Sequence, residues 1–312
     1  MAKKLGLIGV PTSMGAFAPG QEKGPGALRD AGLIERLSRA GVEVVDYGDG
    51  GGVRRWRPDK GNRRAQNLTA VVDVASETAR RVENAHAVGH LPLVTGGDCT
   101  IELGTVAGLL PSGRPGLIYF DLHPDLNVPD SVRYGALDWM GVAHMLGEEG
   151  AAEPLSRLGP RFPLLADEDV FLFSYGPEQA TEWERGVIER RGLQGTPIRE
   201  VATDPEGAAA RALGQMEARY DRLLVHFDVD SVDFTDLPLS ENAGRNEGLP
   251  FEAAMRALGT LLGSERLAAL TITEFNPDHG EEDGSTAEAL ADGLARALSG
   301  LPALGLETPT NP

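Results

Sequence analysis

The chain has 312 residues, enough to bury one large core, and its composition is that of an ordinary globular protein. A formal net charge of −18 argues against nucleic acid and anionic membranes as partners, because both repel an acidic surface. The single cysteine, Cys99, excludes an internal disulfide, and no apolar stretch is long enough for a signal-peptide core or a membrane span. We therefore expect a cytoplasmic protein.

Hydrophobic patterning alternates between strands and helices along the chain. Short apolar runs predict strands at residues 5–10, 42–45, 91–94, 116–120, 170–173, 223–227 and 267–273. Apolar residues at helical spacing predict helices at residues 25–37, 68–88, 139–146, 208–218, 251–262 and 287–298. Residues 49–64, which contain three consecutive glycines and several arginines, predict an exposed loop. Because no linker or repeat interrupts this alternation, we expect residues 1–312 to form a single α/β domain with a mainly parallel sheet.

Acidic residues follow two of the predicted strands. Asp121, His123 and Asp125 come directly after strand 116–120, and Asp228 and Asp230 after strand 223–227. In an extended chain this two-residue spacing puts the side chains of each group on one side. If the strands are neighbours, like charges ~4 Å apart cost about 4 kcal/mol per pair at an effective dielectric near 20, so the cluster needs added positive charge. The pattern predicts a site for divalent cations; the alternative is a pair of solvated acidic strand ends.

Four motifs occur in an order that matches one known family. They are Gly96-Gly97-Asp98, Asp121-Leu122-His123-Pro124-Asp125-Leu126-Asn127, Asp228-Val229-Asp230-Ser231-Val232-Asp233 and Glu274-Phe275-Asn276-Pro277. On these motifs the chain resembles the ureohydrolases, which include arginase and agmatinase, over nearly its whole length. The resemblance implies a three-layer α/β/α sandwich around a mainly parallel sheet of roughly eight strands. It also implies a homo-oligomer, a trimer or a hexamer.

The resemblance further implies a centre of two divalent metal ions, which are usually manganese in this family. The expected ligands are Cys99 and Asp125 in the first site, His123 and Asp230 in the second, and Asp121 and Asp228 as bridges. A hydroxide held between two such ions is a nucleophile at neutral pH, because the ions lower the pKa of water. It is expected to attack the planar carbon of a small cationic guanidino compound and release urea and an amine. Glu274 is expected to pair with the guanidinium; the alternative is a strand-end carboxylate in solvent.

Position 99 departs from the family pattern, because a cysteine stands where the family usually has histidine. A thiolate is a competent ligand and shifts preference from manganese towards zinc, iron or nickel. The alternative is that Cys99 is a small buried hydrophobic residue and the first site is empty. Family members specialised for N-hydroxylated arginine also carry cysteine here, which adds hydroxyguanidines to the expected substrate class.

The segment after the second motif departs further. Asp138 occupies the place of a histidine that the family uses as a proton shuttle, and Tyr134 the place of a serine. An aspartate whose pKa is raised by burial can still shuttle protons; the alternatives are impaired proton transfer and recognition of a cationic substrate. Tyr134 is expected to shrink the pocket for an amino-acid head group, although Asn127 of the family pattern is kept. Arginine itself is therefore a less expected substrate than for a typical arginase.

Two further histidines are candidates. His226 shares the odd-even phase of Asp228 and Asp230, which predicts a place beside the metal ligands. His144 lies beyond Asp138 in a predicted helix, where a packed or surface histidine is the ordinary role and a substitute proton shuttle the alternative.

The leading hypothesis is therefore a binuclear metal hydrolase that cleaves a C–N bond of a guanidino or N-hydroxyguanidino compound. Two rivals remain. One is a catalytically silent, metal-poor relative that binds a small molecule or a protein partner. The other is a hydrolase of linear amidines, such as formimino compounds, on the same fold. The set of carboxylate ligands favours an enzyme, because all the family's carboxylates are present.

Overall fold

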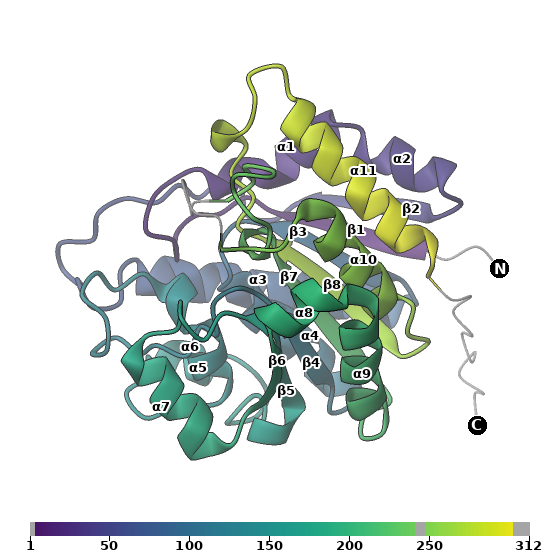
Figure 1. Ribbon diagram of the computed structural model, residues 1–312. Coiled ribbons are helices and arrows are strands. Elements are labelled where there is room, and N and C mark those ends of the chain that lie inside the picture. The colour runs from purple at the N-terminus through teal and green to yellow at the C-terminus, as the bar shows by residue number, and fades with distance from the viewer. Residues whose placement is uncertain (1–3, 241–246, 302–312) are drawn as a thin grey trace, which may run out of the picture.

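The fold is built on a parallel sheet. A computed structural model describes residues 4–240 and 247–301. Within these residues eight strands form one sheet in the order β2-β1-β3-β8-β7-β4-β5-β6, and every neighbouring pair is parallel (Figure 1). The strands are β1 (Lys4–Val10), β2 (Glu43–Asp49), β3 (Leu91–Gly96), β4 (Gly116–Phe120), β5 (Val170–Tyr175), β6 (Gln194–Pro197), β7 (Leu223–Asp228) and β8 (Leu267–Thr273). The predicted α/β sheet is confirmed.

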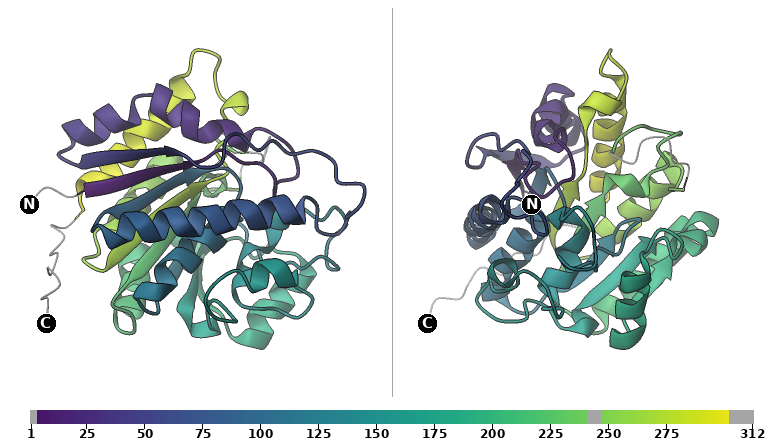
Figure 2. Two further views of the ribbon diagram at one scale, coloured as in Figure 1. Left: turned by 180° about the vertical axis from the view of Figure 1, so that it is seen from behind. Right: turned by 90° about the vertical axis from the view of Figure 1, so that its left-hand side faces the viewer.

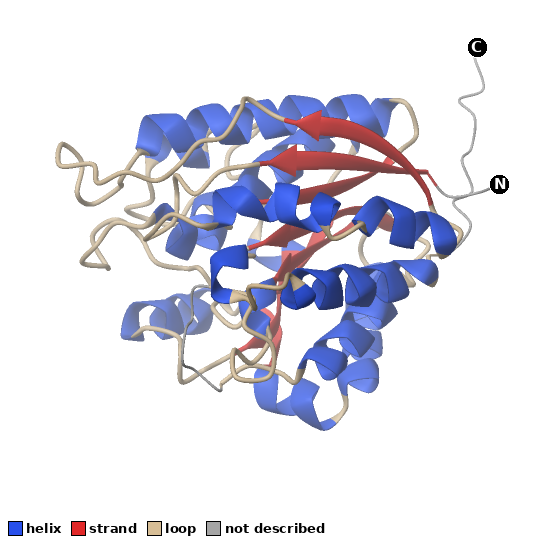
Figure 3. Cartoon of the chain, turned by 90° about the horizontal axis from the view of Figure 1, so that it is seen from above, coloured by secondary structure: helices blue, strands red, loops and turns tan. Residues whose placement is uncertain are grey.

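Helices cover both faces of this sheet (Figures 2 and 3). They are α1 (Gly24–Asp30), α2 (Leu33–Arg39), α3 (Leu68–Ala87), α4 (Ile101–Leu109), α5 (Gly141–Met145), α6 (Glu153–Ser156), α7 (Glu182–Arg191), α8 (Ile198–Thr203), α9 (Pro205–Glu217), α10 (Phe251–Leu262) and α11 (Ser285–Ser299). One buried apolar cluster joins the sheet to α1, α2, α8, α9, α10 and α11, and the other joins it to α3, α4, α5 and α7. The arrangement is a three-layer sandwich, as the sequence predicts.

Strand order decides where the four sequence motifs meet. Neighbours in the middle of the sheet are β3, β8, β7 and β4, although β4 follows β3 in the chain. Each of these four strands leads directly into one of the motifs, and the loops after them gather beyond the arrowheads in Figure 3. Ligands of open parallel sheets bind at such an edge, where strand order reverses. The fold therefore brings the motifs together at one place.

The structure corrects two sequence-based helix boundaries and adds elements that were not predicted. The helix predicted over residues 25–37 is two helices, because Gly32 has a φ of 75° and breaks the α-helix between α1 and α2. The helix predicted over 139–146 begins as a 3₁₀ turn, and its α-helical part is only α5. Strand β6 and helices α6, α7 and α8 were not predicted. The residues of β6 and α7 are too polar to show a hydrophobic period.

Helix α7 did carry a detectable start signal. The Thr181 hydroxyl accepts the Glu184 N–H and the Glu184 carboxylate accepts the Thr181 N–H, which is the capping box encoded by Thr-x-x-Glu. No helix in the described part of the chain is long and apolar enough to span a membrane.

Candidate metal centre and substrate cavity

The acidic side chains meet through turns rather than through extended strands. Strands β4 and β7 are paired neighbours, which places Asp121, just after β4, beside Asp228 at the end of β7. The prediction that an extended chain aligns Asp121, His123 and Asp125 is wrong, because β4 ends before them and Asp125 has a φ of 48°. The Asp121 carboxylate instead accepts the His123 N–H at 2.6 Å, and the Asp228 carboxylate accepts the Asp230 N–H at 2.7 Å.

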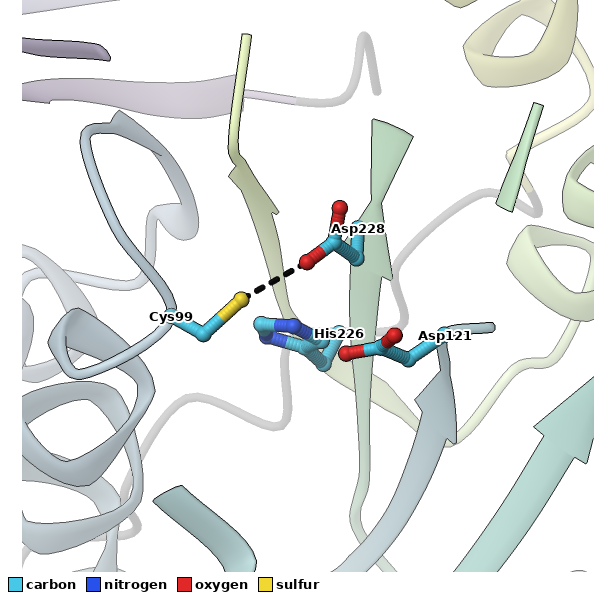
Figure 4. Close-up of side chains that lie close together, drawn as sticks. All are labelled: Cys99, Asp121, His226 and Asp228. Atoms are coloured by element: carbon cyan, nitrogen blue, oxygen red, sulfur yellow. Dashed lines mark hydrogen bonds between the residues drawn. The ribbon is translucent and has the colours of Figure 1, made fainter. Parts of the chain in front are cut away.

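The first group of possible ligands lies between β4, β7 and the loop after β3 (Figure 4). It consists of Cys99, Asp121, His226 and Asp228, whose ligand atoms lie within 4.8 Å of one another, and all four are buried. The Cys99 thiol donates to Asp228 Oδ2 at 2.8 Å and lies 3.3 Å from Thr273 Oγ1. Cys99 is therefore placed as a ligand would be, not turned away into the apolar core.

The second group shares Asp121 with the first. It consists of Asp121, His123 and Asp230, again with ligand atoms within 4.8 Å of one another. His123 Nδ1 lies 2.8 Å from Asp230 Oδ2. Because one carboxylate belongs to both groups, the two could hold a pair of ions that share a ligand, as a binuclear centre requires.

Burial and mutual repulsion set the charge states in these groups. Burial, followed by repulsion from Asp228 and Asp230, raises the pKa of Asp121 well above its ordinary value, and burial and Asp230 do the same for the pKa of Asp228. Burial also favours the neutral acid of Asp230, but the adjacent His123 outweighs it and lowers the pKa of Asp230. The carboxylates in turn raise the pKa of His123 to about 9 against the opposing effect of burial.

The charge and the donor types of the two groups fit divalent cations. Among the described residues, no lysine or arginine pairs with Asp121 or Asp228, and Asp121 Oδ2 is buried without a hydrogen-bond partner. An unpaired buried carboxylate oxygen is costly unless a cation takes it. Carboxylate, imidazole and thiolate together form a ligand set that suits transition metals.

Asp125 lies beside the two groups but belongs to neither. It is buried, and its Oδ2 accepts the Tyr119 hydroxyl at 2.6 Å. His226 occupies the place in the first group that the sequence analysis gave to Asp125. Its ring stacks on Tyr119 with centroids 4.1 Å apart, and its Nε2 lies 3.3 Å from Thr273 Oγ1. Whether Asp125 or His226 completes the first site is a prediction that metal binding would test.

Both groups open into a cavity of about 610 Å³. Nine predicted site residues line it, namely Cys99, His123, Asp125, Asn127, Tyr134, Asp138, Asp228, Asp230 and Glu274. Glu274 follows β8 with a φ of 63° and accepts the Gln21 amide at 2.9 Å and the Cys99 N–H at 3.1 Å. Burial, then Asp228 and Asp98, raises the pKa of Glu274 well above its ordinary value. Glu274 is only 7% exposed, so it is not a strand-end carboxylate in solvent.

Comparison with known proteins decides the family. A sequence model described as the arginase family matches residues 3–299. The chain belongs to the arginase family. Arginase from Bacillus caldovelox is 30% identical over 300 residues, which cover 94% of this chain and 98% of that relative. The crystal structure of arginase from Bacillus cereus has a TM-score of 0.84 at 27% identity, covering 96% of this chain and 99% of that one.

A second kind of relative shares the fold alone. The crystal structure of formimidoylglutamase from Bacillus subtilis has a TM-score of 0.70 at 18% identity, covering 96% of this chain and 87% of that one. The fold and family predicted from the motifs are therefore confirmed, and the chain is an arginase-family hydrolase with a cluster of potential metal ligands.

Asp138 lies in the wall of this arginase-family cavity. It is buried, and its Oδ1 accepts the Trp139 N–H at 3.0 Å while its own N–H donates to the Gly15 carbonyl at 3.1 Å. Burial, followed by repulsion from Glu274 and Asp98, raises the pKa of Asp138 well above its ordinary value. Asp138 therefore keeps its proton to a higher pH than an ordinary aspartate does.

The other predicted residues lie at different depths. Asn127 is buried, and its Oδ1 accepts the hydroxyls of Ser131 and Thr181 at 3.0 Å each. Tyr134 is half exposed at the cavity mouth. His144 is fully buried between Met140 O at 2.6 Å and the Ala152 N–H at 3.1 Å, and burial lowers its pKa to about 4. It is the packed, neutral histidine that the sequence analysis gave as its ordinary role.

Glu184 lines the cavity and was not predicted as a site residue. Its carboxylate caps α7 and also accepts the Leu126 N–H at 3.1 Å, while the Trp183 indole donates to the Leu126 carbonyl at 3.0 Å. Glu184 therefore ties α7 to the loop that carries His123 and Asp125. The capping-box pattern would have located the helix start, but not this second bond.

Proposed function

We propose that this arginase-family hydrolase is a metal-dependent enzyme that cleaves a C–N bond of a guanidino or N-hydroxyguanidino compound and releases urea or hydroxyurea. The observation that carries the proposal is the arrangement of the cavity. Two ligand groups share Asp121, and the buried carboxylate of Glu274 lies against the first of them through its bond to the Cys99 N–H. A cationic, planar head group at Glu274 would lie next to the metal ligands.

The donors present fit two divalent ions. The residues that would hold them are Cys99, Asp121, His123, Asp228 and Asp230, with Asp125 or His226 completing the first site. When bound, such ions supply an activated water at neutral pH, because they lower the pKa of water towards 7. Manganese is usual for the family, and zinc, iron or nickel suit a thiolate ligand.

Glu274 is suited to bind and orient the guanidinium. Its two oxygens would offer the planar fork of a guanidinium a pair of acceptors, a pairing that gives strong, directional hydrogen bonds. Gln21 and the Cys99 N–H already fix the carboxylate at 2.9 Å and 3.1 Å. Burial raises the pKa of Glu274, so a bound cation would favour its ionised form, and part of the interaction energy would be used to release the proton.

Asp138 is suited to move a proton. Cleavage of the C–N bond leaves an amine that must gain a proton, and a carboxylic acid with a raised pKa can donate one. Asp138 is held by the Trp139 N–H on one oxygen, which leaves the other oxygen for transfer. This is the role that the family gives to the histidine at this place.

The ligand role of Cys99 depends on loss of its proton. Without a cation, burial and then repulsion from Asp228 and Glu274 raise the pKa of the thiol well above its ordinary value. A bound cation reverses this effect, because it stabilises the thiolate directly. The hydrogen bond from the thiol to Asp228 shows that the two side chains already point at one place.

Elemental analysis of the purified, unsupplemented protein, in metal atoms per chain, is the first test. Near two atoms, with urea or hydroxyurea released from guanidino compounds, is the expected result. Release of formamide from formimino compounds, without urea, would support the linear-amidine alternative instead. A value of zero that persists after incubation with manganese, zinc, iron and nickel would overturn the hydrolase and leave a binding protein.

A further inference from the structure

The outer end of the cavity differs chemically from its acidic floor. Phe17, Tyr134 and Trp139 line the cavity, and Phe17 contacts the other two rings. The Phe17 and Tyr134 rings meet edge to face with centroids 5.4 Å apart, and Phe17 stacks on Trp139 at 5.9 Å with an interplanar angle of 18°. We call these three residues together with Arg133 the mouth subsite.

The aromatic rings of the mouth subsite remain open to a ligand. Phe17 is 48% exposed and Tyr134 is 50% exposed. A single exposed aromatic residue is ordinary on a protein surface, but three rings joined through Phe17 in the wall of a cavity form a platform for a planar apolar group. A substrate made only of a guanidinium and a short amine chain would leave this platform unused.

Arg133 gives the mouth subsite a positive charge. Its guanidinium lies 5.6 Å from the centroid of the Tyr134 ring. Within the described residues it is the only lysine or arginine that lines the cavity, and no described carboxylate forms an ion pair with it. In a chain of net charge −18, an arginine without an acidic partner beside an acidic cavity is available to an anion.

The loop that carries the mouth subsite is fixed in place. Gln66 donates its side-chain amide to the Tyr134 carbonyl at 2.6 Å and its N–H to the Gly135 carbonyl at 2.9 Å. Gly135 has a φ of 63°, and a Cβ there would lie 2.3 Å from the Arg63 carbonyl oxygen. The bond from Asp138 N–H to the Gly15 carbonyl joins the segments of Trp139 and Phe17. The rings are therefore positioned by the backbone on both sides.

The cavity is large enough for a longer substrate. Its volume of about 610 Å³ lies in the range of about 300–1,000 Å³ that holds drug-sized ligands, well beyond what a guanidinium requires. The floor accepts a cation and the mouth offers aromatic faces and one cation. A second positive charge in the substrate tail would be repelled by Arg133.

We infer that the mouth subsite binds the tail of the substrate, and that this tail carries a planar ring and a carboxylate, as in an N-aroyl guanidino acid. The inference rests on the proposed function for the position of the guanidinium head. The ring packs against Phe17 and Trp139, and the carboxylate pairs with Arg133 beside Tyr134.

Three matched compounds test the inference by calorimetry on the full chain with its metal. They are Nα-benzoyl-L-arginine, Nα-acetyl-L-arginine, which lacks the ring, and Nα-benzoyl-L-argininamide, which lacks the carboxylate. The benzoyl acid should bind about tenfold more tightly than the acetyl acid and about fivefold more tightly than the amide. In Phe17→Ala the ring preference should disappear, and in Arg133→Gln the carboxylate preference should disappear.

Two control variants separate these effects from general ones. Phe162→Ala removes an aromatic residue that is 49% exposed and does not line the cavity, and Arg39→Gln removes an exposed charge in α2. Both should keep the wild-type ratios. Equal affinity for the three compounds, no binding of any, or ratios unchanged in Phe17→Ala and Arg133→Gln would overturn the mouth subsite. Urea release, measured in parallel, tests the proposed function separately, because the binding ratios can hold without turnover.

Discussion

Two sets of buried carboxylates in this molecule are treated in opposite ways. Glu148, beyond α5, pairs with Arg190 at 2.6 Å and with Arg191 at 2.5 Å. Asp169 pairs with Arg114 at 2.6 Å and with Arg161 at 3.5 Å. At the strand ends, in contrast, no described arginine or lysine pairs with Asp121 or Asp228.

The difference shows what each set is for. An arginine that pairs with a buried carboxylate neutralises it and occupies the space around it. The carboxylates of Glu148 and Asp169 therefore have a structural role. At the strand ends no cationic side chain among the described residues pairs with Asp121 or Asp228, so burial and repulsion favour their neutral acids, and this leaves space that a bound cation would fill. Four substitutions would sharpen or break this comparison, and we take them from the largest expected effect to the smallest.

Asp138→Asn should lower turnover by about a hundredfold to ten-thousandfold, because an amide cannot donate the proton that the leaving amine needs. The metal content per chain should stay unchanged, since Asp138 lies outside both ligand groups. Steady-state kinetics together with elemental analysis makes the test. Full activity, or loss of metal, would refute the proton-transfer role.

Glu148→Gln should lower the free energy of unfolding by about 3–5 kcal/mol, because it leaves two arginines beside a neutral group. Urea unfolding of wild type and variant measures the change. Exposed Glu153, the first residue of α6, supplies the matched control, because it pairs with Arg157 directly after that helix. Glu153→Gln should change stability by less than about 0.5 kcal/mol, and an equal effect of both substitutions would break the distinction.

Asp121→Asn should have the opposite effect on stability: in the metal-free protein it should raise the free energy of unfolding by about 2 kcal/mol near neutral pH. Asparagine keeps the acceptor for the His123 N–H and removes one of the repelling charges. The pKa of Asp121 is raised in the folded state, so folding binds its proton and the wild type recovers stability as the pH falls towards the ordinary pKa of aspartate.

The gain from Asp121→Asn should therefore shrink at acidic pH, as thermal unfolding at several pH values in a chelator would show. The same variant should lose metal from both groups. A destabilised metal-free variant at pH 7 would mean that Asp121 is already neutralised within the protein.

Cys99→His should raise manganese affinity by about tenfold and reduce the preference for zinc, iron or nickel, because imidazole is a harder ligand than thiolate. Competition between metals, followed by elemental analysis, detects the change. Unchanged amounts and identity of metal would show that the thiol is a bystander in the first group.

The sequence predicted the fold well where a short apolar run is followed directly by an acidic motif. The runs before Asp121, Asp228 and Glu274 are buried strands in the structure, and the motifs after them meet as expected. Helix α7 and strand β6 were not predicted, because their residues are polar and show no hydrophobic period.

The site was harder to predict in detail, because alternation assumes an extended chain. The turn after β4 places Asp125 outside both ligand groups, whereas His226 lies within β7 and joins the first group in phase with Asp228. The neighbours of a side chain across a twisted sheet are not encoded in local spacing. The mouth subsite also joins residues 17 and 133–139, a contact that no motif announces.

Glu184 makes one cavity wall a cooperative unit. The same carboxylate holds the amides of Leu126 and Thr181, and the Thr181 hydroxyl holds Asn127. Fraying of the first turn of α7 therefore releases the loop beyond the acidic motif at the same moment. Hydrogen exchange of the Leu126 and Thr181 amides should report a single opening event, in which the local stability of one short helix sets how often this side of the cavity opens.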